Sequence, residues 1–234
     1  MKFIRKFLRL LKYRIKFLAK NDNAKINYFV QSRFLDKSLT DLMNYYGSDK
    51  GGFNKDHNFS DYYSTIFFDK KESIKNILEI GLGTNNTKVL SNMGSQGKPL
   101  ASLRAWKDYF VNANVYGADI DKEILKNEDR IKTFYVDQTN AISIAELYKN
   151  IGNINFDIII DDGLHEYNAN ICLFENSFKF LSKQGIYIIE DVFFKDKKKF
   201  FDYFQSRNYN FSIIDIFHKN NISNNCLVII YQCY

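Results

Sequence analysis

The chain has 234 residues, of which 45% are hydrophobic and 26% charged, so it can bury the core of one substantial globular domain. Its net charge of +6 is concentrated in residues 1–20, where eight basic residues leave the rest of the chain at −2, which argues against nucleic acid as a partner of the folded body. Its cysteines, Cys172, Cys226 and Cys233, are too widely spaced for a disulfide framework or a zinc motif and fit a reducing compartment.

Residues 1–20, MKFIRKFLRLLKYRIKFLAK, have the spacing of an amphipathic helix. At about 100° per residue, all the basic side chains except Arg14 fall on one side and the apolar ones on the other. No apolar run reaches the length of a signal-peptide core or a spanning helix, so we expect a cytoplasmic protein. We assign residues 1–22 to a basic amphipathic helix. It would lie on the inner membrane face or pack against its own domain or a second subunit, and we expect a homo-oligomer.

Residues 23–70 are predicted to form a helical and irregular segment that covers the site. Within it, residues 27–46 carry apolar side chains at helical spacing. The stretch that follows, YYGSDKGGFNKDHNFSDYYSTIF, is rich in glycine, aspartate, asparagine and aromatic residues and has no clear period. We therefore expect a loop that leads into a helix near residues 62–68.

Residues 71–234 alternate between strand and helix patterns, which predicts parallel βαβ units. The predicted strands are residues 74–80, 114–120, 131–136, 156–160, 185–190, 210–217 and 224–234, and the predicted helices are 102–110, 141–151, 167–181 and 196–208. The fold class is therefore α/β, a Rossmann-like, doubly wound, mostly parallel sheet with a C-terminal antiparallel hairpin at one edge and an N-terminal helical extension. Such a sheet binds its ligand at the carboxyl ends of its strands.

The first of these strands runs into a glycine-containing turn, EIGLGTNN. Gly81 and Gly83 allow a tight turn and a close approach of the backbone to a ligand, and Glu79 lies at the end of the strand. Without the third glycine of a dinucleotide-binding fingerprint this pattern is weak on its own, and a dehydrogenase is the least favoured function.

Two further strands end in polar residues that suit a nucleoside. Asp119 ends the second strand, where a carboxylate can bind the two hydroxyls of a ribose. Asp137 and Gln138 follow the third strand, where they can contact an adenine edge. Each residue alone could instead cap a turn or a helix. Three strands that end in polar residues beside the same crevice favour a bound cofactor over three unrelated caps.

The stretch FDIIIDDGLHEYNANI is a buried strand followed by Asp161, Asp162 and His165, and the next strand ends in Glu190 and Asp191. A turn would account for the first two aspartates, a local hydrogen bond for the histidine, and a helix cap for the last two acids. Neighbouring parallel strands lie ~4.8 Å apart, however, so these side chains would meet at one edge of the sheet.

Five segments, ILEIGLGT, YGADID, FYVDQT, FDIIIDDGLHE and GIYIIEDV, resemble the class I S-adenosylmethionine-dependent methyltransferases. More narrowly, they resemble the metal-dependent sugar O-methyltransferases of mycinamicin and tylosin biosynthesis, to which NYYGSDKGG and SLRAWKDYF are similar too. The resemblance covers roughly residues 42–192 and leaves out the basic N-terminal segment. Its specific part is the D-D-x-x-H element followed by E-D.

This resemblance implies S-adenosylmethionine as methyl donor and Mg²⁺ or Mn²⁺ as the metal. It assigns cofactor binding to Glu79, Gly81, Gly83, Asp119, Asp137 and Gln138. It assigns the metal to Asp162, Glu190 and Asp191, and the role of general base to His165, while Asp161 remains a support or turn residue. The chemistry is consistent, because a divalent cation lowers the pKa of a bound hydroxyl and a neutral imidazole can then take its proton.

Substrate contacts are expected from the covering segment and from one helix. The candidates are Asp49, Lys50, His57, Tyr63 and Arg104. An arginine here could contact the phosphates of a nucleotide-sugar. We therefore expect methylation of a sugar hydroxyl, on a nucleotide-sugar or glycan precursor of capsule or lipopolysaccharide or on a glycosylated natural product. The loop 84–100 is fuller than in the antibiotic-sugar enzymes, which leaves the acceptor sugar open.

Two alternatives remain, one in the same enzyme class and one in another class. A catechol-type O-methyltransferase would place carboxylates at the same two strand ends, but its base is a lysine where this chain has His165. A non-catalytic membrane-surface module that keeps the cofactor pocket would explain the basic N-terminal segment, but it would not explain the complete set of expected metal ligands.

Overall fold

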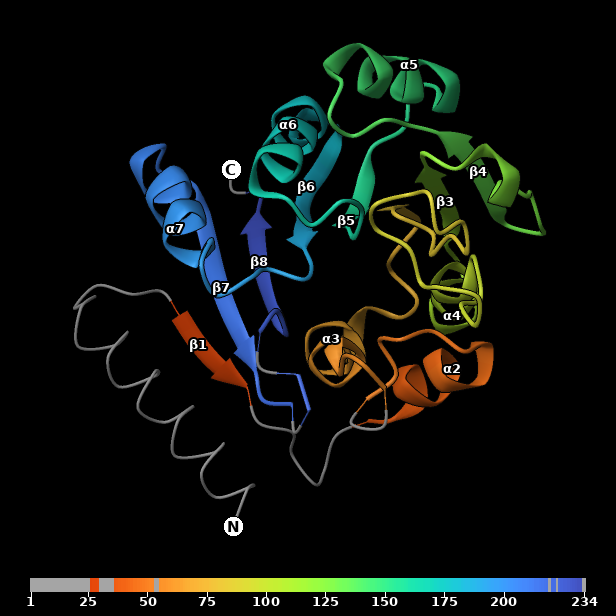
Figure 1. The fold of residues 1–234 in the computed structure, drawn as a ribbon, viewed down its shortest axis with the longest axis horizontal. Helices are drawn as coiled ribbons and strands as arrows, with labels where there is room; N and C mark the ends of the chain where they lie inside the picture. The colour runs from red at the N-terminus through yellow and green to blue at the C-terminus, as the bar shows by residue number, and fades with distance from the viewer. Residues whose placement is uncertain (1–25, 30–35, 53–54, 219, 222, 233–234) are drawn as a thin grey trace.

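The computed structural model describes residues 26–29, 36–52, 55–218, 220–221 and 223–232 (Figure 1). The amphipathic helix predicted for residues 1–22 lies outside these residues. Within them, no helix is both long and apolar enough to cross a membrane.

The described strands form one eight-stranded sheet in the order β1-β7-β8-β6-β5-β2-β3-β4. Their bounds are Ile26–Phe29 (β1), Asn76–Ile80 (β2), Asn114–Asp119 (β3), Ile131–Tyr135 (β4), Phe156–Asp161 (β5), Leu181–Ile189 (β6), Asn210–Ile216 (β7) and Cys226–Tyr231 (β8). Strand β8 runs antiparallel to β6 and β7, and the other neighbouring pairs are parallel. The predicted α/β class and the C-terminal antiparallel pair are confirmed.

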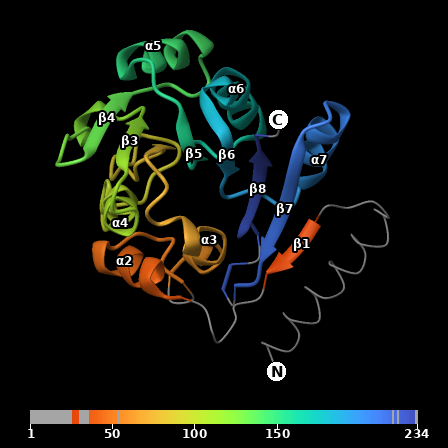
Figure 2. The same cartoon turned by 180° about the vertical axis from the view of Figure 1, so that it is seen from behind.

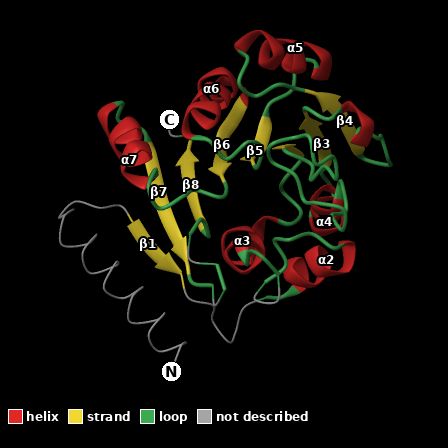
Figure 3. Ribbon diagram, in the orientation of Figure 1, coloured by secondary structure: helices red, strands yellow, loops and turns green. Residues whose placement is uncertain are grey.

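Helices cover both faces of the sheet (Figures 2 and 3). Their bounds are Ser38–Tyr46 (α2), Phe59–Phe67 (α3), Ala101–Tyr109 (α4), Ala141–Ile151 (α5), Tyr167–Ser177 (α6) and Lys197–Ser206 (α7). One core joins α2, α3 and α4 to the sheet, and the other joins α5, α6 and α7. Successive residues of a strand point to opposite faces, so Ile158 and Ile160 belong to the first core and Ile159 to the second.

The segment predicted as a helix over residues 27–46 differs from that prediction. Ile26–Phe29 forms a strand that pairs in parallel with β7, so β1 and not the C-terminal hairpin lies at this edge of the sheet. A short run such as INYF has β-forming residues but is too brief for periodicity to separate strand from helix. Helix α2 begins only at Ser38, whose backbone N–H donates to Asp36 Oδ1 at 2.9 Å.

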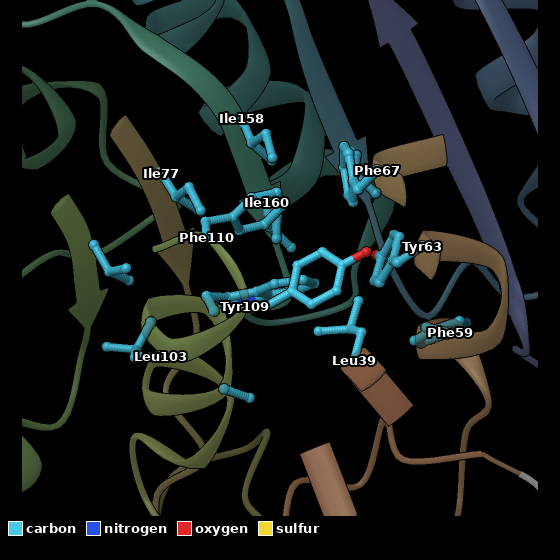
Figure 4. Packing of buried hydrophobic residues seen from close by; sticks show 14 of the residues in the cluster. Leu39, Phe59, Tyr63, Phe67, Ile77, Leu103, Tyr109, Phe110, Ile158 and Ile160 are labelled. Carbon is cyan, nitrogen blue, oxygen red and sulfur yellow. The ribbon is translucent and has the colours of Figure 1, made fainter. Parts of the chain in front are cut away.

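Helices α2 and α3 pack beside α4 within the first core. Figure 4 shows Leu39, Tyr63 and Phe67 gathered with Phe110 and Ile160 of the body of the domain. This packing ties the covering segment to the sheet, because the side chains that anchor it are fully buried.

The strand register sets the predicted site residues side by side. Ile80 of β2 pairs with Asp161 of β5, and Asp161 pairs with Ile189 of β6. The ladder continues one step further, because Asp162 N donates to Ile80 O at 2.8 Å and Glu190 N donates to Asp161 O at 2.9 Å. The residues that follow these strands therefore share one edge of the sheet.

Candidate active site

A cavity of about 1010 Å³ opens beyond the carboxyl ends of β2 to β6. Of the residues predicted from the sequence, its lining includes Asp49, His57, Gly81, Gly83, Asp119, Asp137, Gln138, Asp162, His165 and Asp191. The predicted residues Lys50, Tyr63, Glu79, Arg104 and Glu190 do not line it. The sequence therefore located the cavity, but five of its candidates lie behind the wall or elsewhere.

The turn after β2 requires glycine at Gly81. This residue has φ +92°, and a Cβ there would lie 2.0 Å from the carbonyl oxygen of Asp162. The missing side chain lets the turn after β2 pass against the turn after β5. Gly83, with φ +77°, also lies in the left-handed region that favours glycine. Both glycines line the cavity, and their contact with a cofactor stays a prediction.

The acids that follow or end β3 and β4 face the cavity and also accept hydrogen bonds from nearby backbone N–H groups. Asp119 accepts hydrogen bonds from Leu82 N at 2.7 Å and Asp121 N at 2.8 Å, and burial raises the pKa of its carboxyl. Asp137 accepts from Thr139 N and Thr139 Oγ1 at 2.9 and 2.6 Å. Asp119 accepts one bond on each carboxylate oxygen, while both bonds to Asp137 fall on Oδ1, so each acid keeps acceptor capacity for a ligand hydroxyl.

Gln138 links the turns after β4 and β5. Its Oε1 accepts from Leu164 N at 2.7 Å, and its Nε2 donates to Asp161 Oδ1 at 3.1 Å. Asp161 is fully buried, accepts a further hydrogen bond from Asn170 Nδ2 at 2.9 Å, and has a pKa raised by burial to about 6. Asp161 therefore holds the turn that carries Asp162 and His165, the support role that the sequence left open.

Asp162, His165 and Asp191 come together at the cavity. One nitrogen or oxygen atom from each lies within 4.8 Å of the others. His165 and Asp191 have φ of +59° and +54°, a left-handed backbone that costs a residue other than glycine ~1–2 kcal/mol. Such strain is concentrated at functional sites. Here it directs both side chains to the same point.

His165 is neutral in this position. Burial, helped by the nearby charge of Lys50, lowers the pKa of its imidazole to about 4. Its Nε2 lies 3.6 Å from Asp191 Oδ2, and its Nδ1 is buried without a hydrogen-bond partner. A neutral imidazole with a ring nitrogen to spare has the properties of a proton acceptor.

Glu190 points away from this cluster. Its Oε1 accepts from the Tyr63 hydroxyl at 2.5 Å and its Oε2 from Lys50 Nζ at 2.8 Å. It is 1% exposed, whereas Asp191 faces the cavity. Both acids follow the end of β6, and with the left-handed backbone at Asp191 only this second acid faces the cavity. The structure thus brings together two of the three acids that were predicted to bind the metal.

Lys50 and Glu79 are buried behind the cavity wall and not on its surface. Lys50 Nζ also contacts Asp162 Oδ2 and lies 3.6 Å from Glu79 Oε1. Burial opposes a charged lysine, but the carboxylates of Asp162 and Glu190 raise the pKa of Lys50 well above its usual value. Burial also raises the pKa of Glu79 to about 7, and its Oε2 accepts from Trp106 Nε1 at 2.7 Å.

His57 approaches Asp191 from the covering segment. Its Nδ1 lies 3.1 Å from Asp191 Oδ1, to which Asn224 Nδ2 also donates at 3.2 Å. Sequence reasoning missed Asn224 because it lies in a turn between two strands and has no motif of its own. The turn's only sequence signal was its richness in asparagine.

Arg104 does not reach the cavity. Its guanidinium makes a two-pronged ion pair with Glu128, through Nε to Oε2 at 3.0 Å and Nη2 to Oε1 at 2.7 Å. Helix α4 turns this side chain toward the segment before β4, so the structure does not place Arg104 with the predicted residues that line the cavity.

Comparison with known proteins relates this geometry to enzymes of known activity. No family model matches the sequence. The 8-demethyl-8-alpha-L-rhamnosyl tetracenomycin-C 2'-O-methyltransferase of Streptomyces olivaceus is 33% identical over 147 residues, which are 63% of this chain and 35% of that enzyme. The mycinamicin VI 2''-O-methyltransferase of Micromonospora griseorubida is 33% identical over 155 residues, covering 66% of this chain and 36% of that enzyme.

Over 63% and 66% of its length, this chain is similar to two sugar O-methyltransferases. The expected resemblance is therefore confirmed, although the chain spans about a third of the length of these curated relatives. The structure of the MycE methyltransferase in complex with Mg, SAH and mycinamycin VI superposes on this chain with a TM-score of 0.63. Sequence identity is 24%, and the match covers 84% of this chain and 54% of MycE. The domain has the class I methyltransferase fold.

Proposed function

We propose that this protein transfers a methyl group from S-adenosylmethionine to a sugar hydroxyl with the help of Mg²⁺ or Mn²⁺. The observation that carries the proposal is the convergence of Asp162, His165 and Asp191 on a cavity bounded by the glycine turn. The MycE structure, which has the same fold, contains Mg and SAH.

The donor set fits a hard divalent cation. Asp162 and Asp191 offer carboxylate oxygens, and Mg²⁺ prefers oxygen ligands while keeping several waters, so a site with two acids leaves places for sugar hydroxyls. A bound cation would lower the pKa of the acceptor hydroxyl. We propose Asp162 and Asp191 as its ligands and place Glu190 behind them, in support of Asp162 through Lys50.

The residues around the cation would each do one task. His165, neutral and adjacent to both acids, would take the proton of the hydroxyl. Gly81 and Gly83 would let the cofactor lie against the backbone, while Asp119 would bind its ribose and Asp137 would lie near its adenine. The transfer itself is an in-line displacement, so the remaining requirement is alignment of the sugar oxygen with the methyl group.

The charge of the cavity favours an acceptor that carries no phosphate. Its described lining holds one lysine, Lys88, and the aspartates Asp49, Asp56, Asp119, Asp121, Asp137, Asp162 and Asp191. A diphosphate would be repelled by these carboxylates, and Arg104 lies elsewhere. A neutral glycoside or glycan is therefore the preferred acceptor. A nucleotide-sugar precursor of capsule or lipopolysaccharide is the less favoured one.

A methyl-transfer screen tests this proposal. Purified protein, labelled S-adenosylmethionine and Mn²⁺ would be incubated with neutral glycosides, nucleotide-sugars and catechols, and the products read by mass spectrometry. We expect methylated glycosides and no product when EDTA is in excess. Methylation of catechols alone would identify the catechol-type alternative. No S-adenosylmethionine binding by calorimetry at millimolar concentrations would remove the proposal altogether.

The affinity for the metal is expected to rise with pH up to about 7. Burial, with the neighbouring Glu190 carboxylate, raises the pKa of Asp191 to about 7, so below this pH a proton must leave before a cation binds. Competition with one proton weakens binding by about tenfold per pH unit. Calorimetry with Mn²⁺ between pH 5.5 and 8.5 measures this. Equal affinity at pH 6 and pH 8 would contradict a metal ligand at Asp191 that must lose a proton near pH 7.

A further inference from the structure

Behind the cavity wall lies a buried group of charged and polar side chains, which we call the inner cluster: Lys50, Tyr63, Glu79 and Glu190. Lys50 comes from the connection between α2 and α3, and its side chain is 2% exposed. Its ammonium meets Glu190 at 2.8 Å and lies 3.6 Å from Glu79. The Tyr63 hydroxyl donates to Glu190 Oε1, and Trp106 Nε1 donates to Glu79 Oε2.

Asp162 belongs to both sides of the wall. It contacts Lys50 from the inner cluster, and it lies with His165 and Asp191 at the cavity. Lys50 thus links the connection between α2 and α3 to the ends of β5 and β6. The candidate metal ligands follow these two strands.

The electrostatics of the inner cluster depend on this one ammonium. Glu79 and Glu190 are shielded from water and Asp162 is largely so, and among the described residues Lys50 is the cation within salt-bridge distance of all three. Carboxylates so close together repel one another, and a buried charge left without its partner is strongly destabilising.

We propose that Lys50 is a positioning residue, a built-in cation that holds Asp162 and Glu190 at adjacent strand ends so that the cavity side of Asp162 is ready for a divalent ion. This inference rests on the metal site of the proposed function. It assigns Lys50 a place behind the site, in contrast to the substrate contact expected from the sequence.

The test compares Lys50→Met with Lys197→Met. Lys197 is a matched control, because its side chain is likewise buried, at 5% exposed, and forms an ion pair with Asp215. It does not line the cavity. Melting temperatures would be measured in EDTA and in millimolar Mn²⁺. In EDTA we expect Lys50→Met to lose about 10 °C. Mn²⁺ should restore at least half of that loss, because a divalent ion on the cavity side of Asp162 would neutralise part of the negative charge that the missing ammonium leaves unpaired.

If Lys50 only stabilised the fold, Mn²⁺ would not reduce the fall in melting temperature. The melting temperature lost in Lys197→Met should be the same with and without Mn²⁺. A Lys50→Met variant whose loss is equally insensitive to Mn²⁺ would overturn the proposal. If Lys50→Met does not accumulate as folded protein, its refolding yield from urea with and without Mn²⁺ gives the same comparison. Failure of the unaltered protein to bind Mn²⁺ would instead remove the proposed metal site itself, so the two failures are distinguishable.

Discussion

Replacing His165 with alanine is expected to lower the rate of methyl transfer by about 100-fold or more while leaving S-adenosylmethionine binding unchanged. The imidazole is neutral, since its pKa is lowered to about 4, and it is adjacent to both candidate metal ligands. It therefore can accept a proton throughout the neutral range. The rate would be measured in single-turnover experiments with labelled cofactor, and cofactor binding by calorimetry.

Added imidazole provides the control for this variant. A small base can diffuse into the space left by the side chain, so we expect imidazole to restore part of the rate of His165→Ala. A variant that transfers methyl groups within a few-fold of the unaltered rate would contradict the assignment of His165 as the base. Loss of cofactor binding in the variant would point to a structural role for the left-handed turn at this residue.

Replacing Asp162 with asparagine is expected to weaken Mn²⁺ binding by more than about 100-fold and to reduce activity to the level seen in EDTA. Residues that only support a metal ligand cost about 10–100-fold when changed, so loss of a direct ligand should exceed that range. Asp162 also contacts Lys50, and the substitution removes charge from both sides of the cavity wall. Calorimetric titration with Mn²⁺ measures the effect.

Asp157→Asn is the matched control for this substitution. Asp157 lies near the start of β5, the strand that Asp162 directly follows, and its carboxylate accepts from Lys75 N at 2.7 Å and Asn76 N at 3.1 Å. Asp157→Asn should lower the stability of the protein and leave its Mn²⁺ affinity within about threefold of the unaltered protein, because at ordinary ionic strength distant charges are screened. Equal losses of affinity in the two variants would mean that Asp162 acts only through its charge.

The architecture of the body could be predicted because its signals are local. Runs such as Ile158 to Ile160 mark buried strands, and the helices between them carry one apolar face. The edge strand Ile26–Phe29 was missed because its partner, β7, lies almost 190 residues further along the chain, as its pairing of Ile26 with Ile213 shows. No pattern within four residues reveals such a pairing.

The sequence allowed us to predict which residues lie at the strand ends, but not the direction in which each side chain points. Glu190 and Asp191 are neighbours in sequence, and the left-handed backbone at Asp191 helps to send them to different sides of the wall. Lys50 and Tyr63 meet Glu190 across separations of 140 and 127 residues. Such contacts depend on packing, so the sequence indicated that both residues lie near the site but could not place them behind the cavity wall.

Diffraction from crystals grown with SAH and Mn²⁺ would test the metal site most directly, since the anomalous signal of manganese locates the ion independently of the protein atoms. We expect one strong peak within coordination distance of Asp162 and Asp191, beside His165 and in the same cavity as SAH. A peak bound elsewhere on the chain, or SAH bound with no manganese near these two aspartates, would contradict this expectation.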